Sequence, residues 1–398
     1  MKGYLRSDGR KGIRNVVLVA YMVECAHHVA REIAMPLREN DVHVIGWQGC
    51  YPNAHGQNMM QRLGTHPNVG AVLLVSLGCE GFDKQSVVRT VRASGRPVEV
   101  MTIQQTGGTR ATIEAGRAWV AERRAELDAM QPVEMAASEL IVGTICGGSD
   151  GTSGIAANPA MGRAFDLLIP EGAACIFEET GELIGCEHTM ADRAATPELG
   201  REIIRAVAKA GRYYETLGHG SFSSGNADGG LTTIEEKSMG AYAKSGASEI
   251  VGLLKPGDIP PTPGLYLMDM IPDGEVRFGF PNINDNAEIS ELIACGAHVV
   301  MFSTGRGSVV GSAISPVIKV CGNPETYARL SEDMDVDAGR IVSGAATLDE
   351  VGSEIRDLVL SVADGAKTKS EALGHQEFHL AYKSFEPIGP SCLPRASG

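Results

Sequence analysis

The sequence predicts an α/β fold of two domains, in which helices cover both faces of parallel sheets. Short apolar runs rich in Val and Ile alternate with segments of helix length, which is the β-α alternation of parallel sheets. The chain has 398 residues, which at about 150 residues per domain allows two domains. It also holds 49 glycines, above the usual share of about 7%, as expected where strands turn sharply into helices.

The first predicted domain covers residues 1–130. Its expected strands are 15–23 (NVVLVAYMV), 42–47, 70–77 and 97–103, and its expected helices are 27–39 and 110–130. Pro36 is expected to break the first helix, because proline lacks the amide that an interior turn needs. The segment MQPVEMAAS at 130–138 has the composition of a linker, so the boundary is placed near residue 130.

The alternation starts again in the second predicted domain, residues 131–398. Its expected strands are 140–145, 175–177, 264–268 and 297–302. Its expected helices begin near residue 158 and cover 197–209, 234–245 and 345–363. From about residue 366 the chain carries scattered Gly and Pro, and we expect this last stretch to run over the surface.

Composition excludes several classes of protein. The net charge of −14 and the lack of a basic block argue against a nucleic-acid partner, although local Arg and Lys residues can still bind a small anionic substrate. No apolar run approaches the roughly 20 residues that span a bilayer, and the polar start does not resemble a signal peptide. Nine cysteines without a CxxC pair indicate reduced thiols. We therefore expect a cytoplasmic protein with no membrane partner.

Chemically active side chains follow the predicted strands at the ends where parallel sheets bind ligands. The strand at 140–145 leads to Cys146 and CGGSDGTSG, and the strand at 175–177 leads to Glu178 and Glu179. The strand at 97–103 leads to QQTGGT, which ends at Thr109, and the strand at 297–302 leads to STGRGS. Thiols, carboxylates, hydroxyls and glycines thus recur at one edge, which predicts the functional site there.

The segment EETGELIGCEH at 178–188 is the strongest candidate for a metal site. Carboxylate, imidazole and thiolate are ligands of Fe(II), Mn(II) and Zn(II). The candidate ligands are Glu179, Glu187 and His188, with Cys146 as a further one. Because adjacent residues of a helix face different directions, a joint role for Glu187 and His188 needs a loop. The alternative is a solvated acidic turn.

Two glycine-rich loops are candidate anion sites. Their backbone N–H groups, and the N-terminus of the helix after CGGSDGTSG, can hold a carboxylate or sulfonate, with Arg306 gripping the anion. TGRGSVVG also contains GxGxxxG, but Pro316 follows too soon for a full dinucleotide-binding helix. The candidate substrate-binding residues are Gly147, Gly148, Ser149, Asp150, Thr304, Gly305, Gly307, Ser308 and Thr109.

Six motifs occur in order along the chain: GYLRSDGRKGIRN, HPNVGAVLLVSLGCE, IQQTGGT, CGGSDGTSGIAANPAMG, GNADGGLTTIEEKSMG and FSTGRGS. Together they resemble the altronate/galactarate dehydratase family, from residue 3 to at least residue 345. The opening residues 1–15 and ECAHHVARE at 24–32 look closest to the branch that cleaves (2R)-sulfolactate. The family's acidic segment usually reads SEVPEMFGAEH, and it is matched here by Glu179, Glu182, Glu187 and His188, with Gly181 and Cys186 in place of Pro and Ala.

The resemblance implies a divalent metal, most often Fe(II), with Mn(II) or another divalent ion as alternatives. It implies that the metal is bound by a Rossmann-like C-terminal domain and that the N-terminal domain dimerises. Many members also carry a small β-clip domain. Since this chain starts directly at GYLRSDG, the resemblance implies a separate small subunit in a hetero-oligomer.

The reaction implied by the resemblance is a β-elimination from a small acidic 2-hydroxy acid. A proton leaves C2 and sulfite or hydroxide leaves C3, so a base must face C2 and donors must receive the leaving group. Lys237 and His55 are the candidate bases, and Arg306 is the candidate for holding the substrate. The expected reaction converts (2R)-3-sulfolactate to pyruvate and sulfite. Dehydration of a sugar acid is the alternative.

Three alternative interpretations of the protein's function stay open on the sequence alone. GxGxxxG favours an NAD-dependent oxidoreductase. A non-catalytic scaffold subunit is a second alternative. An iron–sulfur hydratase that uses Cys50, Cys79 and Cys146 is the third.

Overall fold

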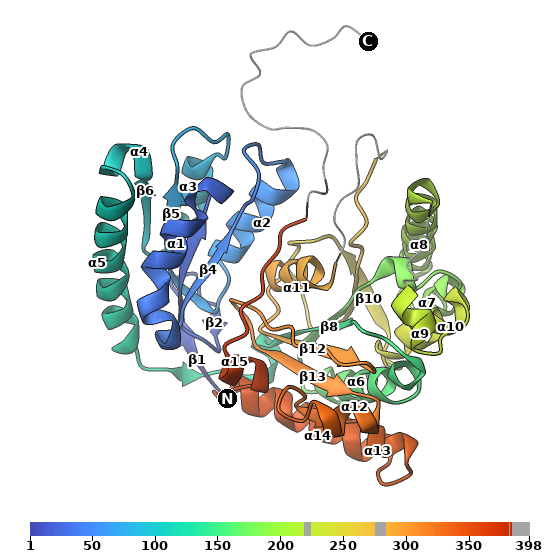
Figure 1. The fold of residues 1–398 in the computed structure, drawn as a ribbon. Coiled ribbons are helices and arrows are strands. Elements are labelled where there is room, and N and C mark those ends of the chain that lie inside the picture. Colours follow the sequence, from blue (N-terminus) through green and yellow to red (C-terminus); the bar gives the residue numbers. More distant parts are fainter. Residues whose placement is uncertain (219–223, 275–283, 382, 384–398) are drawn as a thin grey trace, which may run out of the picture.

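The structure, a computed structural model, describes residues 1–218, 224–274, 284–381 and 383. Figure 1 shows two parallel sheets with helices around them, one built from the first third of the chain and the other from the rest. The predicted α/β class and the helix-flanked parallel sheet are therefore confirmed. No helix in these ranges has both the length and the apolar character that a membrane crossing requires.

A parallel sheet of four strands forms the N-terminal half, in the order β4-β3-β5-β6. Its strands are β3 (Val16–Tyr21), β4 (Val42–Gly46), β5 (Val69–Ser76) and β6 (Val98–Thr102). Its helices are η1 (Glu24–Ala26), α1 (His27–Ala34), η2 (Met35–Asn40), α2 (Ala54–Gly64), α3 (Lys84–Ala93), α4 (Ile103–Thr106) and α5 (Thr109–Asp128). Helices α1 and α5 pack on one face, and α2 and α3 on the other. As predicted, the first helix breaks at Pro36, because α1 gives way there to the 3-10 helix η2.

A small antiparallel sheet lies at the start of the chain, in the order β2-β1-β7. Its strands are β1 (Lys2–Leu5), β2 (Lys11–Gly12) and β7 (Val133–Glu134). The sequence did not predict it, because these strands are too short to show a hydrophobic period. The predicted linker at 130–138 is thus partly a strand, and it pairs with the first residues of the chain.

A sheet of seven parallel strands forms the C-terminal half, in the order β10-β11-β9-β8-β12-β13-β14. Its strands are β8 (Ile141–Cys146), β9 (Ala174–Phe177), β10 (Ile250–Leu254), β11 (Gly264–Met268), β12 (Val299–Thr304), β13 (Val317–Cys321) and β14 (Val336–Asp337). The predicted strands at 140–145, 175–177, 264–268 and 297–302 are confirmed as β8, β9, β11 and β12. The central strands are buried along their whole length, as expected when both faces are covered.

The helices of the C-terminal half fall into three groups. Helices α6 and α14 pack together on one face of the sheet, and α11 packs on the other. Helices α7 to α10 gather beside the sheet, away from α14 (Figure 1). The helices are η3 (Ala137–Glu139), the π-helix η4 (Ser153–Ala157), α6 (Asn158–Leu168), η5 (Thr180–Glu182), α7 (Glu187–Ala191), α8 (Pro197–Leu217), α9 (Ser224–Asp228), α10 (Ile234–Ala243), α11 (Asp285–Ala294), α12 (Pro324–Arg329), α13 (Gly339–Val342), α14 (Leu348–Ala363) and α15 (Lys369–Leu373).

The two halves share one hydrophobic core. It joins buried residues of β3, α2 and α3 to buried residues of β8, β12 and α11. Helix α2 packs against α11, so the N-terminal half covers the face of the large sheet on which α11 lies. Separate cores fill the outer faces, under α6 and α14 in one half and under α1 and α5 in the other.

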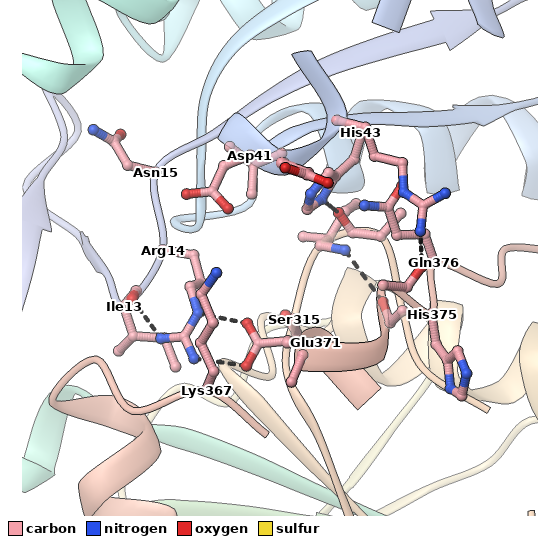
Figure 2. A pocket seen from close by; sticks show the side chains of 18 of the residues that line it. Ile13, Arg14, Asn15, Asp41, His43, Ser315, Lys367, Glu371, His375 and Gln376 are labelled. Atoms are coloured by element: carbon pink, nitrogen blue, oxygen red, sulfur yellow. Dashed lines mark hydrogen bonds and ion pairs between the residues drawn. The ribbon is translucent and has the colours of Figure 1, made fainter. Parts of the chain in front are cut away.

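The last described residues, 369–381 and 383, cross from one half to the other, and we name them the C-terminal strap. Glu371 forms a two-fold ion pair with Arg14, with distances of 2.7 and 2.9 Å to Nε and Nη2 (Figure 2). The pair lines a cavity of about 580 Å³ at the amino ends of β3 and β4. Leu380 O accepts a hydrogen bond from Gln48, and Leu380 is buried. The expectation of a surface course after residue 366 is therefore wrong for this part of the chain.

Candidate active site

The predicted edge of the large sheet carries a cluster of charged side chains. Strands β11, β9, β8 and β12 are parallel neighbours, so they end at one edge. Cys146 ends β8, Glu178 and Glu179 follow β9 directly, and α10 and α11 supply further residues. We name this group the acidic cluster: Cys146, Glu178, Glu179, Glu182, Lys237, Lys244, Asp285, Glu288 and Glu291.

Cys146 lies between two carboxylates. Its Sγ is 3.6 Å from Glu179 Oε1 and 3.3 Å from Glu182 Oε2, and its N–H donates to Glu179 Oε2 at 3.1 Å. Burial and the charge of Glu182 raise the pKa of the thiol to about 12. Cys146 is therefore a neutral thiol at neutral pH, which can donate to the carboxylates but is a weak nucleophile.

Two lysines at α10 compensate part of the negative charge. Lys237 Nζ lies 2.5 Å from Glu182 Oε1, and the fully buried Lys244 forms an ion pair with Glu179. Lys244 Nζ is also 3.9 Å from Cys146 Sγ. Burial lowers the pKa of Lys237, but the charges of Glu182 and other cluster residues outweigh it and raise the pKa above its usual value. Lys237 is therefore an ammonium that stabilises negative charge and can donate a proton.

Glu178 and Glu288 are also buried, but no lysine or arginine among the described residues forms an ion pair with either of them. Both carboxylate oxygens of Glu178 are buried and accept no hydrogen bond from a described residue. Burial, together with the charge of Glu288, raises the pKa of Glu178 well above its usual value. Burial also raises the pKa of Glu288 to about 8, although Lys383 opposes this effect. A buried carboxylate without a partner costs several kcal/mol, so both side chains are either protonated or balanced by a bound cation.

The cluster contains two metal-ligand groups, which share Glu179. One is Cys146, Glu179 and Glu182, and the other is Glu178, Glu179 and Glu288, and in each the ligand atoms lie within 4.8 Å of one another. In the first group both carboxylates already contact lysine ammoniums. In the second, only Glu179 contacts an ammonium of the described part of the chain, and neither oxygen of Glu178 accepts a hydrogen bond from that part. A divalent cation therefore fits the second group better. The three carboxylates of this group suit Mn(II) or Mg(II), and carboxylates also bind iron in other proteins.

The backbone at Glu179 explains how consecutive residues enter one group. In a strand, successive side chains point to opposite faces, which would separate Glu178 from Glu179. Glu179 instead has a left-handed conformation, with φ 73° and ψ 50°, which turns the chain at the end of β9. This conformation costs a residue other than glycine about 1–3 kcal/mol and is typical of functional sites. The contacts of Glu179 with Cys146 and Lys244 hold the strained turn in place.

The loop after β8 lies against the acidic cluster. A β-carbon at Gly147 would be 2.1 Å from Asp285 Oδ2, so only glycine fits there. Burial and the charge of Glu182 raise the pKa of Asp285 to about 6. Gly148 has a positive φ of 58°. The N–H groups of Gly148 and Ser149 donate to no described residue, and Ser149 Oγ lies 3.6 Å from Cys146 Sγ. These two amides can hold an anionic group beside the cluster.

The helix N-terminus after this loop is closed by the protein itself. Asp150 Oδ1 accepts hydrogen bonds from the N–H groups of Thr152 at 2.8 Å and Ser153 at 3.1 Å. Asn323 donates to the second oxygen at 3.2 Å. These helix amides are thus not free for a substrate, contrary to the expectation from the sequence. Asp150 shapes the loop. Gly305 packs on its carboxylate, and a β-carbon at position 305 would lie 1.8 Å from Asp150 Oδ1.

The second glycine-rich loop joins the first. Gly148 O accepts a hydrogen bond from the N–H of Arg306 at 2.9 Å, and Thr304 Oγ1 accepts one from Gly307 at 2.9 Å. The Arg306 side chain is exposed and donates to Gly225 O at 2.5 Å, while Ser308 Oγ accepts a bond from Val310 N–H at 3.3 Å. The chain from 305 to 316 contains no helix and leads directly to β13. The dinucleotide reading of GxGxxxG is therefore wrong, since that site needs a helix N-terminus.

Several predicted site residues lie elsewhere. Glu187 and His188 belong to α7, where His188 is exposed and Glu187 accepts a bond from Gly185 N–H, and neither joins a metal-ligand group of described residues. Thr109 is exposed at the start of α5, beside the other sheet. The exposed Cys50 and Cys79 likewise join no metal-ligand group with the buried Cys146.

His55 connects the N-terminal half to the cluster. It lies on α2, and its Nε2 is 3.2 Å from Glu291 Oε1 on α11. Lys383 binds the other oxygen of Glu291 at 2.7 Å. Burial raises the pKa of Glu291, but these two partners outweigh it and leave the pKa below its usual value. Glu291 is therefore ionised and paired, unlike Glu178 and Glu288.

Sequence reasoning assigned no role to Lys244, Asp285, Glu288 or Glu291. Acids three residues apart on the apolar helix DNAEISELIA were the available signal, because this spacing puts all three on one buried face. Lys244 follows Lys237 by seven residues, which is two helical turns, so a lysine pair on one face could also have been inferred.

Fold and site together define an α/β enzyme whose charged groups lie at the carboxyl edge of a parallel sheet. Residues 3–128 match the family model "D-galactarate dehydratase/Altronate hydrolase, second domain", and residues 137–385 match "D-galactarate/Altronate dehydratase, C-terminal". The chain belongs to the D-galactarate/altronate dehydratase family, as the motifs predicted, and it is a carbon–oxygen or carbon–sulfur lyase.

Three curated relatives show the range of reactions in the family. The chain is 36% identical to (2R)-sulfolactate sulfo-lyase subunit beta of Chromohalobacter salexigens, over 95% of this chain and 96% of that one. It is 31% identical to altronate dehydratase of Escherichia coli, over 95% of this chain and 76% of that one. It is also 31% identical to galactarate dehydratase (L-threo-forming) of Escherichia coli, over 92% and 73% of the two chains.

Proposed function

We propose that this protein is the metal-dependent large subunit of a lyase that converts (2R)-3-sulfolactate to pyruvate and sulfite. The similarity to a sulfo-lyase subunit along nearly its whole length supports the substrate. The observation that carries the metal dependence is the Glu178 carboxylate, which is buried next to Glu179 and Glu288 and accepts no hydrogen bond from any described residue. These three residues would hold the divalent metal, and Fe(II) is our assignment for the ion.

When bound, a divalent cation supplies Lewis-acid stabilisation of the negative charge that develops on the substrate carboxylate and C2 hydroxyl. The residues of the chain must then remove the C2 proton and release the C3 substituent. As the C2–H bond breaks, its electron pair forms the C2–C3 double bond, and the C3–S pair leaves with sulfite. The enol product takes a proton at C3, loses its hydroxyl proton and becomes pyruvate.

The Lys237–Glu182 pair is our candidate for moving the C2 proton. Its two charged groups lie 2.5 Å apart inside the cluster, so a proton taken by the Glu182 carboxylate remains beside a compensating ammonium. The raised pKa of Lys237 keeps it charged, so Lys237 itself acts as a proton donor and charge stabiliser and not as the initial base. His55 contacts Glu291 and stays the second candidate base.

The substrate has two anionic ends, and the structure offers separate groups for them. The Gly148 and Ser149 amides lie beside Cys146 and suit one anionic group. Arg306, whose backbone is bonded to Gly148 O, can bind the other with its exposed guanidinium. Recognition at both ends would favour a short dianion over a long polyol.

We further assign roles to the parts of the assembly. Residues 131–398 form the Rossmann-like catalytic domain, and residues 1–130 dimerise and supply His55. A small subunit of the β-clip type completes the hetero-oligomer, in keeping with the name "subunit beta" of a relative. Cytoplasmic location agrees with the eight cysteines in the described ranges, all of which are free thiols.

Sugar-acid dehydration is the second candidate function. Hydroxide is a poor leaving group and needs a proton donor, whereas sulfite does not. The Lys237 ammonium is such a donor, so the site has the chemistry for dehydration as well. The similarity to an altronate dehydratase and to a galactarate dehydratase supports this alternative.

Anaerobic turnover separates the two candidates. The chain is co-expressed with the proposed small subunit, loaded with Fe(II), and offered (2R)-3-sulfolactate, altronate and galactarate. Sulfite and pyruvate in equal amounts are expected from the first substrate only, and EDTA should abolish their release. A keto-deoxy sugar acid from altronate or galactarate would establish the second candidate instead.

Matched variants assign the chemistry in the same assay. Lys237→Met removes the ammonium and should abolish turnover while metal stays bound, since Lys237 is outside the proposed ligand group. Arg329→Met, on α12 away from the cluster, serves as the control and should retain activity. Full sulfite release by Lys237→Met would contradict the role of the Lys237–Glu182 pair.

A further inference from the structure

Glu291 lies on α11 and is contacted by side chains from two other parts of the chain. It follows Glu288 by one helical turn. Lys383 of the C-terminal strap donates to its Oε2 at 2.7 Å, and His55 of the N-terminal half lies 3.2 Å from its Oε1. The Glu291 and Lys383 side chains are 1% and 3% exposed, so solvent does not compete for the pair. Lys383 thus binds one oxygen of Glu291, while the other lies within ion-pair distance of His55 and accepts no hydrogen bond from a described residue.

The strap brings Lys383 to this position over a long path. It is fixed at one end by the Arg14–Glu371 ion pair (Figure 2) and along its course by the bond from Gln48 to Leu380 O. At its other end Lys383 also donates to Met270 O at 2.8 Å, close to the end of β11. Lys383 is therefore a fixed cation at the side of the acidic cluster and not a surface residue.

Glu291 lies one helical turn from the proposed ligand Glu288, although it joins neither metal-ligand group of the described residues. Residues three apart share a helix face, so Glu288 and Glu291 project to the same side of α11. The charge of Glu291 raises the pKa of both Glu178 and Glu288, which shows that it lies within electrostatic reach of them. A catalytic metal needs open positions for substrate, whereas additional protein ligands close them. An unpaired Glu291 would add a carboxylate to a group that already holds three.

We propose that Lys383 is a positioning residue which, with His55, keeps Glu291 away from the metal, so that Glu178, Glu179 and Glu288 leave coordination positions open for the substrate. The inference rests on the metal site proposed above and adds a role for the C-terminal strap. Lys383 contacts Glu291 and Met270 O, and its charge also opposes the raised pKa of Glu288, so its effect through Glu291 is isolated by removing the Glu291 carboxylate as well.

Co(II) spectroscopy tests this role apart from folding. The complete complex is loaded with Co(II), whose visible absorption weakens as its coordination number rises. Lys383→Met should weaken the absorption and lower kcat by about 10- to 100-fold, the range seen for residues that support metal ligands. Lys383→Arg keeps the cation and should retain the wild-type spectrum and most of the activity.

A second variant separates positioning from simple loss of stability. In Lys383→Met/Glu291→Gln the extra carboxylate is absent, so the Co(II) spectrum should return to that of the wild type and kcat should largely recover. The exposed Lys367, just before the strap, supplies the control Lys367→Met, which should match the wild type. A wild-type spectrum and kcat in Lys383→Met would overturn the proposal. If the wild type binds no Co(II), the proposed metal site fails first and this inference fails with it.

Discussion

The replacement of Glu178 by glutamine tests the metal group with little structural disturbance. Glu178 is fully buried, and burial together with the charge of Glu288 raises its pKa well above the usual value, which favours the neutral carboxyl group in the metal-free protein. Gln has nearly the same shape and is also neutral, so the free energy of unfolding without metal should change by less than about 1 kcal/mol. Metal binding should weaken by at least about 100-fold, or about 3 kcal/mol, because a charged ligand is lost.

Proton release supplies a second measure for the same variant. Burial raises the pKa of Glu178 well above its usual value and the pKa of Glu288 to about 8, and both carboxyl groups must lose their protons to bind a cation. Titration calorimetry with Mn(II) in buffers of different ionisation enthalpy should therefore show proton release by the wild type and a smaller release by Glu178→Gln. Glu187→Gln, on α7, is the matched control and should behave as the wild type. Unchanged affinity and proton release in Glu178→Gln would refute the assignment.

Three further predictions follow from individual contacts. Arg14→Met leaves Glu371 unpaired and should lower the free energy of unfolding in urea by about 3 kcal/mol, part of which Arg14→Met/Glu371→Gln should restore. Gly305→Ala would place a β-carbon 1.8 Å from Asp150 Oδ1, so it should lower the free energy of unfolding by about 1–3 kcal/mol and also lower kcat/KM. A β-carbon at Gly151 would have nothing within 4 Å, so Gly151→Ala should change neither quantity. The pKa of Glu288 rises on folding from 4.5 to about 8, so its contribution to the stability of the metal-free protein is complete below pH 4.5 and is lost as the pH rises to about 8. Urea unfolding in EDTA at several pH values measures this dependence. A free energy of unfolding that rises between pH 4.5 and about 8 would contradict the prediction.

The sequence predicted the parallel sheets well because their strands are buried apolar runs. Segments such as VGAVLLVS of β5 and VVMFST of β12 have few other interpretations between helix-length spacers. The small antiparallel sheet was missed because its strands have two to four residues. The burial of the C-terminal strap could not be read from composition, since it depends on Arg14 and Gln48, more than 300 residues away along the chain.

The acidic cluster lies at the edge of the sheet where the sequence placed the functional site, and it contains some of the predicted residues; that this edge is the functional site stays a prediction. Cys146, Glu179 and Lys237 come together as the alternation of strands and helices suggested. Glu187 and His188 were chosen because they are close in sequence to Glu179, but the left-handed turn at Glu179 directs the following chain into α7. Glu288 joins from α11, more than 100 residues later, and the spacing of the acids on α11 indicates one buried face but not which strand end that face meets.

The most direct test of this account is the position of the metal in crystals of the Fe(II)-loaded complex. An anomalous difference map at the iron edge should show one peak within bonding distance of the carboxylates of Glu178, Glu179 and Glu288. A peak at Glu187 and His188, or between Cys146 and Glu182 without contact to Glu178, would contradict the proposed centre.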